Sequence, residues 1–69
     1  MLRYKINILL ELKKAGYPST RLRQEKIIGE STIQKLRTGN TSINLGSLEI
    51  VCQILHCQPG DLVEWVEDA

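Results

Sequence analysis

The sequence predicts an all-α protein of five short helices, and three features of the chain support this fold class. Apolar residues recur at spacings of three and four, the period of a helix that buries one side. Glycine, proline, serine and asparagine interrupt this pattern where helices would begin or end. The length of 69 residues leaves room for one domain with a marginally stabilising core. Residues 1–69 are therefore expected to form a single compact domain.

The first helix is expected over residues 4–15, with Gly16 as its stop and Tyr17-Pro18 beyond it. Its apolar stripe covers about half of the circumference, so the helix should be buried on more than one side. The stripe consists of Ile6, Leu9, Leu10 and Lys13, widened by Ile8 and Leu12.

Two further helices joined by a tight turn are predicted over residues 19–38. Ser19 or Thr20 is a good N-cap for the first of them, which should run to about residue 26 with Leu22 inside. Gly29 caps the second, and Gly39-Asn40 supplies its left-handed stop.

The helix after Gly29 cannot bury its whole polar face. Ile33 and Leu36 form its one apolar pair, within about 60° of each other on a helical wheel. The opposite arc offers acceptors, an amide, hydroxyls and cations, which is the chemistry that reads base edges in a major groove. We therefore predict a helix-turn-helix DNA-binding protein. The arc consists of Glu30, Ser31, Gln34, Lys35 and Thr38, with Arg37 at its edge.

The fourth helix is expected over residues 45–55 with Asn44 as its cap, and a fifth opens with Pro59. Two isoleucines of the fourth helix fall outside its main apolar face, which indicates a contact with another element or another subunit. The inner face is expected to hold Leu45, Leu48, Val51, Cys52 and Leu55. The dimer interface is expected to hold Ile50, Ile54, Val63 and Trp65.

Both termini alternate apolar and charged residues, basic near Arg3 and acidic near Glu64. A short antiparallel ribbon that joins them would match opposite charges and bury Leu2, Tyr4 or Trp65.

Charge is segregated along the whole chain, with basic residues in the first part and acidic residues in the second. Residues 1–40 hold nine cations and three acids, a net +6, whereas residues 41–69 hold five acids and no Lys or Arg. This predicts a basic face toward phosphates and an acidic end turned away.

Neither a cofactor nor a metal is expected. Cys52 and Cys57 with His56 do not make up the four ligands of a metal site, and an ordinary core position for Cys52 is favoured over a functional disulfide. Without an apolar run of about 20 residues or an export signal, the chain is predicted to be cytoplasmic. It offers no nucleophile–base pair and no glycine-rich phosphate loop, so an enzyme is not expected.

The chain resembles the Cro/phage-repressor superfamily of helix-turn-helix regulators (XRE type), which are small bacterial and phage transcription factors. The resemblance is carried by RLRQEKIIGESTIQKLRTG at 21–39 and NLGSLEIVCQILHCQPGDLVEWV at 44–66, about two-thirds of the chain. The pair Thr32-Ile33 and the motif Pro59-Gly60-Asp61-Leu62 are the most specific parts. The resemblance implies a lambda-repressor-like five-helix fold.

The resemblance also implies a double-stranded DNA-binding transcriptional regulator, expected to be a repressor, that acts as a two-fold dimer on a palindromic operator. Recognition helices would occupy successive major grooves with half-sites about 34 Å apart. With the base chemistry above, the expected base readers are Glu30, Ser31, Gln34 and Lys35. The expected phosphate contacts are Ser19, Thr20, Arg21, Arg23, Thr32, Arg37, Thr38 and Asn40. Glu30 would repel the backbone unless it reads a base or is held by Lys26 or Gln34.

One departure concerns the turn. The family commonly has glycine where Ile27 stands and a capping Ser or Thr where Gly29 stands. A β-branched residue at positive φ would be strained, so we expect a different turn with a longer preceding helix.

The alternative function is a protein-interaction module on the same scaffold, of antirepressor or antitoxin type. DNA binding through several cations should weaken steeply with salt, which separates the two functions.

Overall fold

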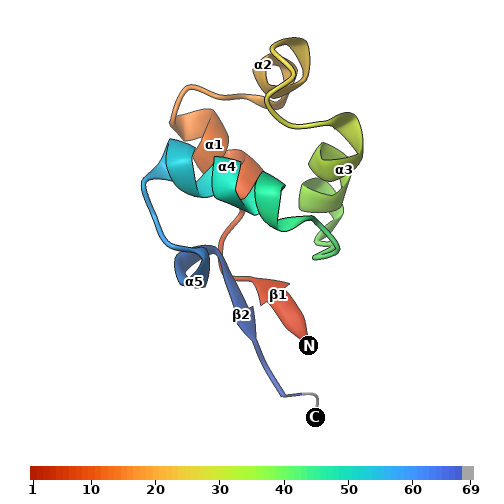
Figure 1. The fold of residues 1–69 in the computed structure, drawn as a ribbon, viewed down its shortest axis with the longest axis vertical. Helices are drawn as coiled ribbons and strands as arrows, with labels where there is room; N and C mark the ends of the chain where they lie inside the picture. The colour runs from red at the N-terminus through yellow and green to blue at the C-terminus, as the bar shows by residue number, and fades with distance from the viewer. Residues whose placement is uncertain (68–69) are drawn as a thin grey trace.

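The computed structural model describes residues 1–67. These residues form five helices and a two-stranded antiparallel sheet (Figure 1). The elements are, in chain order, β1 (Leu2–Tyr4), α1 (Ile8–Lys14), α2 (Ser19–Gln24), α3 (Glu30–Thr38), α4 (Leu45–Leu55), α5 (Pro59–Leu62) and β2 (Val63–Trp65). The five predicted helices are confirmed, and the sheet is the ribbon expected between the termini. None of the helices in residues 1–67 has the length and apolar character that crossing a bilayer demands.

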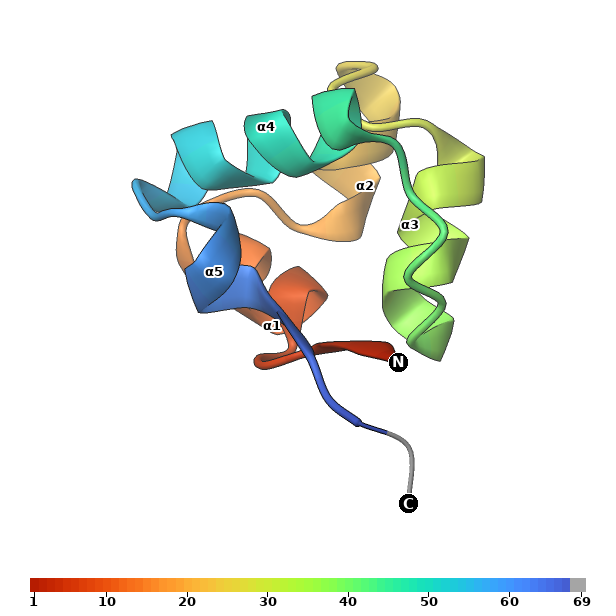
Figure 2. The same ribbon diagram turned by 60° about the horizontal axis from the view of Figure 1, so that its bottom comes forward.

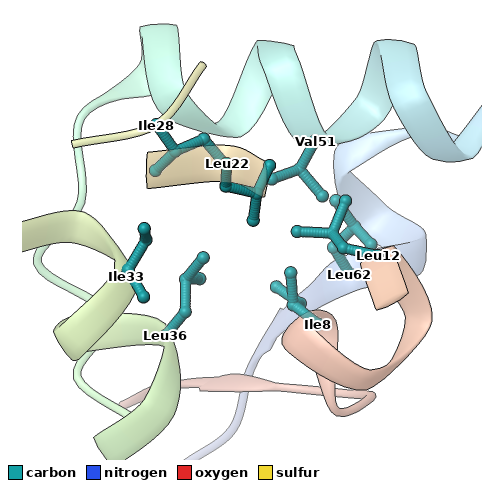
Figure 3. Close-up of a cluster of buried hydrophobic side chains, with 8 residues drawn as sticks. All are labelled: Ile8, Leu12, Leu22, Ile28, Ile33, Leu36, Val51 and Leu62. Atoms are coloured by element: carbon teal, nitrogen blue, oxygen red, sulfur yellow. The ribbon is translucent and has the colours of Figure 1, made fainter. Parts of the chain in front are cut away.

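Helix α1 lies at the centre and contacts both α3 and α4. Figure 1 shows α2 at one end of the molecule and the ribbon at the other, and α3 forms one side in both views of the chain (Figure 2). The core between the helices is entirely apolar (Figure 3). Its buried side chains are Ile8 and Leu12 of α1, Leu22 of α2, Ile28 of the following turn, Ile33 and Leu36 of α3, Val51 of α4 and Leu62 of α5.

Helix α1 is shorter than the predicted helix over residues 4–15. It begins at Ile8 because the Asn7 side chain caps it and accepts a hydrogen bond from the Leu10 amide at 3.1 Å. The buried residues are Ile8 and Leu12, which are four apart on one face, whereas Leu10 is 45% exposed. The predicted stripe is centred on Ile6, Leu9, Leu10 and Lys13, and this centre is wrong. The stripe is wide enough that its edge residues Ile8 and Leu12 face the core instead.

The inner face predicted for α4 is confirmed for Leu48, Val51, Cys52 and Leu55, which are buried or pack against the core, and it is wrong for Leu45. Val51 is the buried centre of this helix, and Leu45, about 120° away on the wheel, is 80% exposed. Ile54 lies about 60° from Val51 and Ile50 about 100° away, so both reach the edge of the core. They are half-buried and pack against it, so they do not point outward as predicted, and the expected contact is with other elements of this chain.

The ribbon pairs Leu2 with Trp65, Arg3 with Glu64 and Tyr4 with Val63. The expected charge match is present, since Arg3 Nε lies 2.7 Å from Glu64 Oε2. The expected burial holds only for Tyr4, which packs against the core. Leu2 and Trp65 remain 50% and 67% exposed, because the outer end of the ribbon extends past the helices (Figure 1).

The ends of four helices share one geometry, in which a left-handed residue follows the helix and the next amide bonds back to the carbonyl five positions earlier. In α1 the left-handed residue is Gly16 and Tyr17 N donates to the Leu12 carbonyl at 2.8 Å. The corresponding bonds are Ile27 to Leu22 after α2, Asn40 to Lys35 after α3 and Cys57 to Cys52 after α4. This cap brings the first and last residues of the bonded segment close together, and a contact between their side chains often accompanies it.

The cap of α2 explains how the turn accommodates Ile27. The left-handed residue is Lys26, with φ 55°, so the β-branched side chain of Ile27 is not strained. Helix α2 ends at Gln24, and the longer helix that we predicted is absent. Pro18 is its N-cap residue and no side chain caps it, so the predicted capping by Ser19 or Thr20 is wrong. Gly29 and Asn44 do stand at the N-caps of α3 and α4, as predicted.

Candidate nucleic-acid interface

Helix α3 presents the polar arc that the sequence predicted. Ile33 and Leu36 are 0% and 6% exposed and hold the helix onto the core. Gln34 is exposed at the centre of the polar arc, and the residues around it are exposed as well: Glu30, Ser31, Arg37 and Thr38. Thr32 and Lys35 are half-buried at the edges of this arc. One side of α3 is therefore fixed by packing, and the other is available to a partner.

The carboxylate of Glu30 connects α2 to α3. The Arg23 Nε donates a short hydrogen bond to Glu30, and Arg23 Nη2 lies 3.3 Å from Glu30 Oε1. Gln34 Nε2 donates to the same Oε1 at 3.1 Å. The hydrogen bond from Arg23, then that from Gln34 and the nearby charge of Arg37, lower the pKa of Glu30 below its ordinary value. The structure thus brings together four predicted site residues.

This network leaves usable groups on α3. Gln34 keeps its amide oxygen and a second N–H, which are the two groups that contact adenine. Glu30, which we expected to be held by Lys26 or Gln34, is held by Gln34 and Arg23. Since Arg23 offsets its charge, Glu30 can stay beside a polyanion with less repulsion.

Arg23→Ala is expected to raise the pKa of Glu30 toward the ordinary glutamate value. The lowered pKa means that the unfolded chain takes up this proton first as pH falls. The stabilisation of the folded chain by the Arg23–Glu30 interaction is therefore complete above the ordinary glutamate pKa and is lost as the pH falls through the lowered pKa of Glu30. The measurement is an NMR titration of the Glu30 side-chain carboxyl carbon in both proteins. Arg21→Ala is the control, because Arg21 does not contact Glu30. An unchanged titration in Arg23→Ala would contradict the network.

Arg21 lies on the other flank of α2 and is engaged within the fold. Its Nε lies 2.8 Å from Glu25 Oε2, and its Nη1 donates to the Gly16 carbonyl at 2.8 Å. Its guanidinium also stacks over the Tyr17 ring, 4.3 Å from the centroid. These contacts hold the connection between α1 and α2, a structural role that the sequence did not indicate.

A shallow depression of about 440 Å³ lies beside α3. It gathers three predicted phosphate contacts, Ser19 and Thr20 at the start of α2 and Arg37 from α3. Lys13 of α1 also lines it, and its side-chain ammonium forms no ion pair or hydrogen bond with residues 1–67. The sequence reading missed Lys13, which it placed in an apolar stripe. The remaining lining residues are Asn7, Leu9, Leu10 and Pro18.

The segment after α3 is held by side chains from both directions. Lys35 Nζ donates to the Ser42 carbonyl at 2.9 Å, so this predicted base reader folds back onto the segment. Asn40 Oδ1 accepts from the Ser42 amide at 2.8 Å, and the Tyr4 hydroxyl donates to the Asn40 carbonyl at 2.7 Å. Thr38 Oγ1 donates to the Gln34 carbonyl at 3.0 Å within the helix. The ribbon thus supports the end of α3 through Tyr4.

Tyr4→Phe is expected to lower the free energy of unfolding by about 0.5–1.5 kcal/mol, because one intramolecular hydrogen bond is lost. Amide exchange should rise at Gly39 and Asn40, next to the carbonyl that Tyr4 holds. Tyr17→Phe is the matched control, since no hydrogen bond from the Tyr17 hydroxyl is present in residues 1–67. Equal exchange in the two variants would exclude the supporting role of Tyr4.

Residues 1–40 contain more cations than acids, so several of their cations have no carboxylate partner among residues 1–67. The three acids of residues 1–40 pair locally, as Glu11 with Lys14, Glu25 with Arg21 and Glu30 with Arg23. Five other cations are without a carboxylate within salt-bridge distance in the described part of the chain: Lys5, Lys13, Lys26, Lys35 and Arg37. The acidic segment α5–β2 lies at the ribbon end, away from α2 (Figure 1).

The residues predicted for a dimer interface are not gathered into one exposed patch. Ile50, Ile54 and Val63 pack against the core, and Trp65 is exposed next to its strand partner Leu2. Within residues 1–67, no three His, Cys, Asp or Glu side chains come together as a metal site.

Comparison with known proteins gives two matches. Residues 5–68 match the family model described as the Cro/C1-type HTH DNA-binding domain. The chain is 36% identical over 64 residues to an uncharacterized HTH-type transcriptional regulator, YozG, of Bacillus subtilis (strain 168). That alignment covers 91% of this chain and 76% of the relative. No solved structure matches the chain significantly.

Proposed function

Because the chain belongs to the Cro/C1-type helix-turn-helix DNA-binding family, we propose that it is a transcriptional repressor that binds one double-stranded DNA sequence. In this proposal α3 enters the major groove. The observation that carries it is the exposed arc of α3, which has Gln34 at its centre and lies next to a depression lined by Lys13 and Arg37. Base-reading groups and phosphate-binding cations then approach the duplex from one direction.

The base readers of this proposal differ in how free they are. Gln34 pairs with adenine through its amide, and Ser31 is exposed beside it. Glu30 accepts from cytosine N4 while Arg23 and Gln34 hold its carboxylate in place. Lys35 contacts guanine or a phosphate only after it leaves the Ser42 carbonyl. We therefore expect Gln34 to contribute most to sequence discrimination.

Phosphate contacts are proposed on both sides of α3. On one side, Ser19, Thr20 and Arg37 line the depression with Lys13. On the other side, Thr38 and Asn40 border the segment that follows the helix, and Thr32 lies at the half-buried edge of α3. Arg23 is exposed and contacts a phosphate while it remains hydrogen-bonded to Glu30. Arg21, which is engaged at Gly16 and Tyr17, contributes through the fold and its charge.

We propose that the 69 residues act as a single domain and bind DNA as a homodimer. The exposed apolar pair Leu2 and Trp65 at the end of the ribbon supports an interface there, because such side chains favour burial against a partner. Half-sites would then be related by two-fold symmetry and separated by about 34 Å along the duplex.

Selection of binding sites from a pool of random duplexes tests this function. The expected result is a palindromic sequence with half-sites one turn apart, whose affinity falls steeply between low and moderate salt. Duplexes with only one half-site should bind far more weakly. Failure to enrich any sequence, with affinity for DNA that does not respond to salt, would favour the protein-interaction alternative.

A further inference from the structure

The end of α4 differs from the other helix ends in the side chains that it brings together. His56 adopts the left-handed conformation with φ 53°, and the Cys57 amide donates to the Cys52 carbonyl at 3.2 Å. The equivalent positions are Leu12 and Tyr17 after α1, and Leu22 and Ile27 after α2. Because this cap brings its two end residues together, it places two thiols side by side, whereas the caps of α1 and α2 join apolar side chains and the cap of α3 joins Lys35 and Asn40.

The two thiols also share one environment. Cys52 and Cys57 are both free and half-buried, and both line a depression of about 370 Å³ between α4 and the start of α5. Burial raises the pKa of Cys57 above its ordinary value, and the adjacent Cys52 raises it further. The depression is open to a small molecule. It is otherwise lined by Leu45, Leu48, Glu49, Gln58 and Pro59.

We propose that Cys52 and Cys57 are an oxidisable dithiol, which a peroxide converts into an intramolecular disulfide across the end of α4. A disulfide requires Cα atoms within about 7 Å of each other, and the hydrogen bond between the two residues closes the backbone over such a span. The inference does not depend on DNA binding, since the pair lies on α4 and the α4–α5 connection and not on α3.

The reaction takes place in two balanced steps. The thiolate of one cysteine attacks the peroxide, the O–O bond breaks, and a sulfenic acid and a molecule of water or alcohol form. The second thiol then attacks the sulfenic sulfur, the S–S bond forms and water leaves. Overall the two thiols lose two electrons and two protons, and one peroxide is reduced. The raised pKa of Cys57 predicts a reaction that accelerates as pH rises.

The test uses the full chain, treated with hydrogen peroxide under native conditions and then with a thiol-alkylating reagent. Intact mass spectrometry should show loss of two hydrogen atoms and no alkylation, and a dithiol reductant should restore both alkylation sites. Cys52→Ser and Cys57→Ser are the matched controls. Each should give a sulfenic acid that a dimedone probe traps, with no intramolecular product.

A second variant tests the geometry of the cap. His56→Gly keeps the left-handed residue and should form the disulfide as readily as the unaltered chain, whereas His56→Val should form it several-fold more slowly. Circular dichroism of both variants before oxidation establishes that they are folded. Independent sulfenic acids on both cysteines of the unaltered chain, or disulfides only between two molecules, would overturn the proposal.

Discussion

Ile33→Ala is expected to lower the free energy of unfolding by about 2–5 kcal/mol, because it removes a buried side chain and leaves a cavity. Ile33 is fully buried on the inner side of α3, near Leu22 of α2 and Ile28 of the following turn (Figure 3). A chain of 69 residues has a total stability of only about 3–10 kcal/mol. The variant should therefore be partly unfolded at room temperature, which urea denaturation followed by circular dichroism measures.

Leu45→Ala is the control for this substitution. Leu45 is a large apolar residue that is 80% exposed at the start of α4, so its truncation should change the stability by no more than about 0.5 kcal/mol. The two variants together test which side of each helix faces the core. A larger loss of stability in Leu45→Ala than in Ile33→Ala would contradict the packing described above.

Gln34→Ala is expected to weaken binding to the selected duplex by about 1–3 kcal/mol, which is about 5- to 150-fold in Kd. The reason is the loss of a paired amide contact to one base, so discrimination at that base should relax while affinity for unrelated duplexes stays the same. Fluorescence anisotropy with the selected duplex and with single-base variants of it measures both effects.

Gln53→Ala is the matched control, because Gln53 is an exposed glutamine on α4. Neither substitution should change the urea midpoint by much, since both side chains are exposed. Gln34→Ala also removes one of the hydrogen bonds to Glu30, and the Arg23 link should remain. Unchanged discrimination in Gln34→Ala would show that α3 does not read bases through this side chain.

The orientation of α3 could be predicted because its apolar residues leave one solution. Ile33 and Leu36 are its one apolar pair, and they had to face the core. The apolar arcs of α1 and α4 are wider, so periodicity did not fix which of their apolar residues are buried. Packing chose Ile8 and Leu12 in α1 and Val51 in α4, and left Leu45 exposed.

The helix ends show a second limit of the sequence. Gly16 and Gly39 mark their left-handed positions, because glycine takes positive φ without strain. Lys26 and His56 carry no such mark, and their conformation accompanies the backbone contacts from the Ile27 amide to the Leu22 carbonyl and from the Cys57 amide to the Cys52 carbonyl. Those contacts involve residues five apart and emerge only when the helix ends are known.

The candidate site also combines residues that could be predicted, because they lie on one helix, with residues that could not, because they come from other elements. The residues of the α3 arc could be found from the wheel alone, because they belong to one helix. The link from Arg23 to Glu30 crosses the turn, and Lys13 reaches the depression from α1, so neither follows from spacing along one helix. The role of Tyr4 depends on the ribbon placing it beside Asn40.

The most direct test of the central claim is an NMR map of backbone amide shifts in the 15N-labelled chain as the selected duplex is added. The arrangement of α3 and the depression predicts the largest shifts at Ser31, Gln34 and Arg37, with a second group at Ser19 and Thr20. The amides of α5 and β2 should move least. Shifts confined to α4, α5 and the ribbon, with α3 unchanged, would contradict the account.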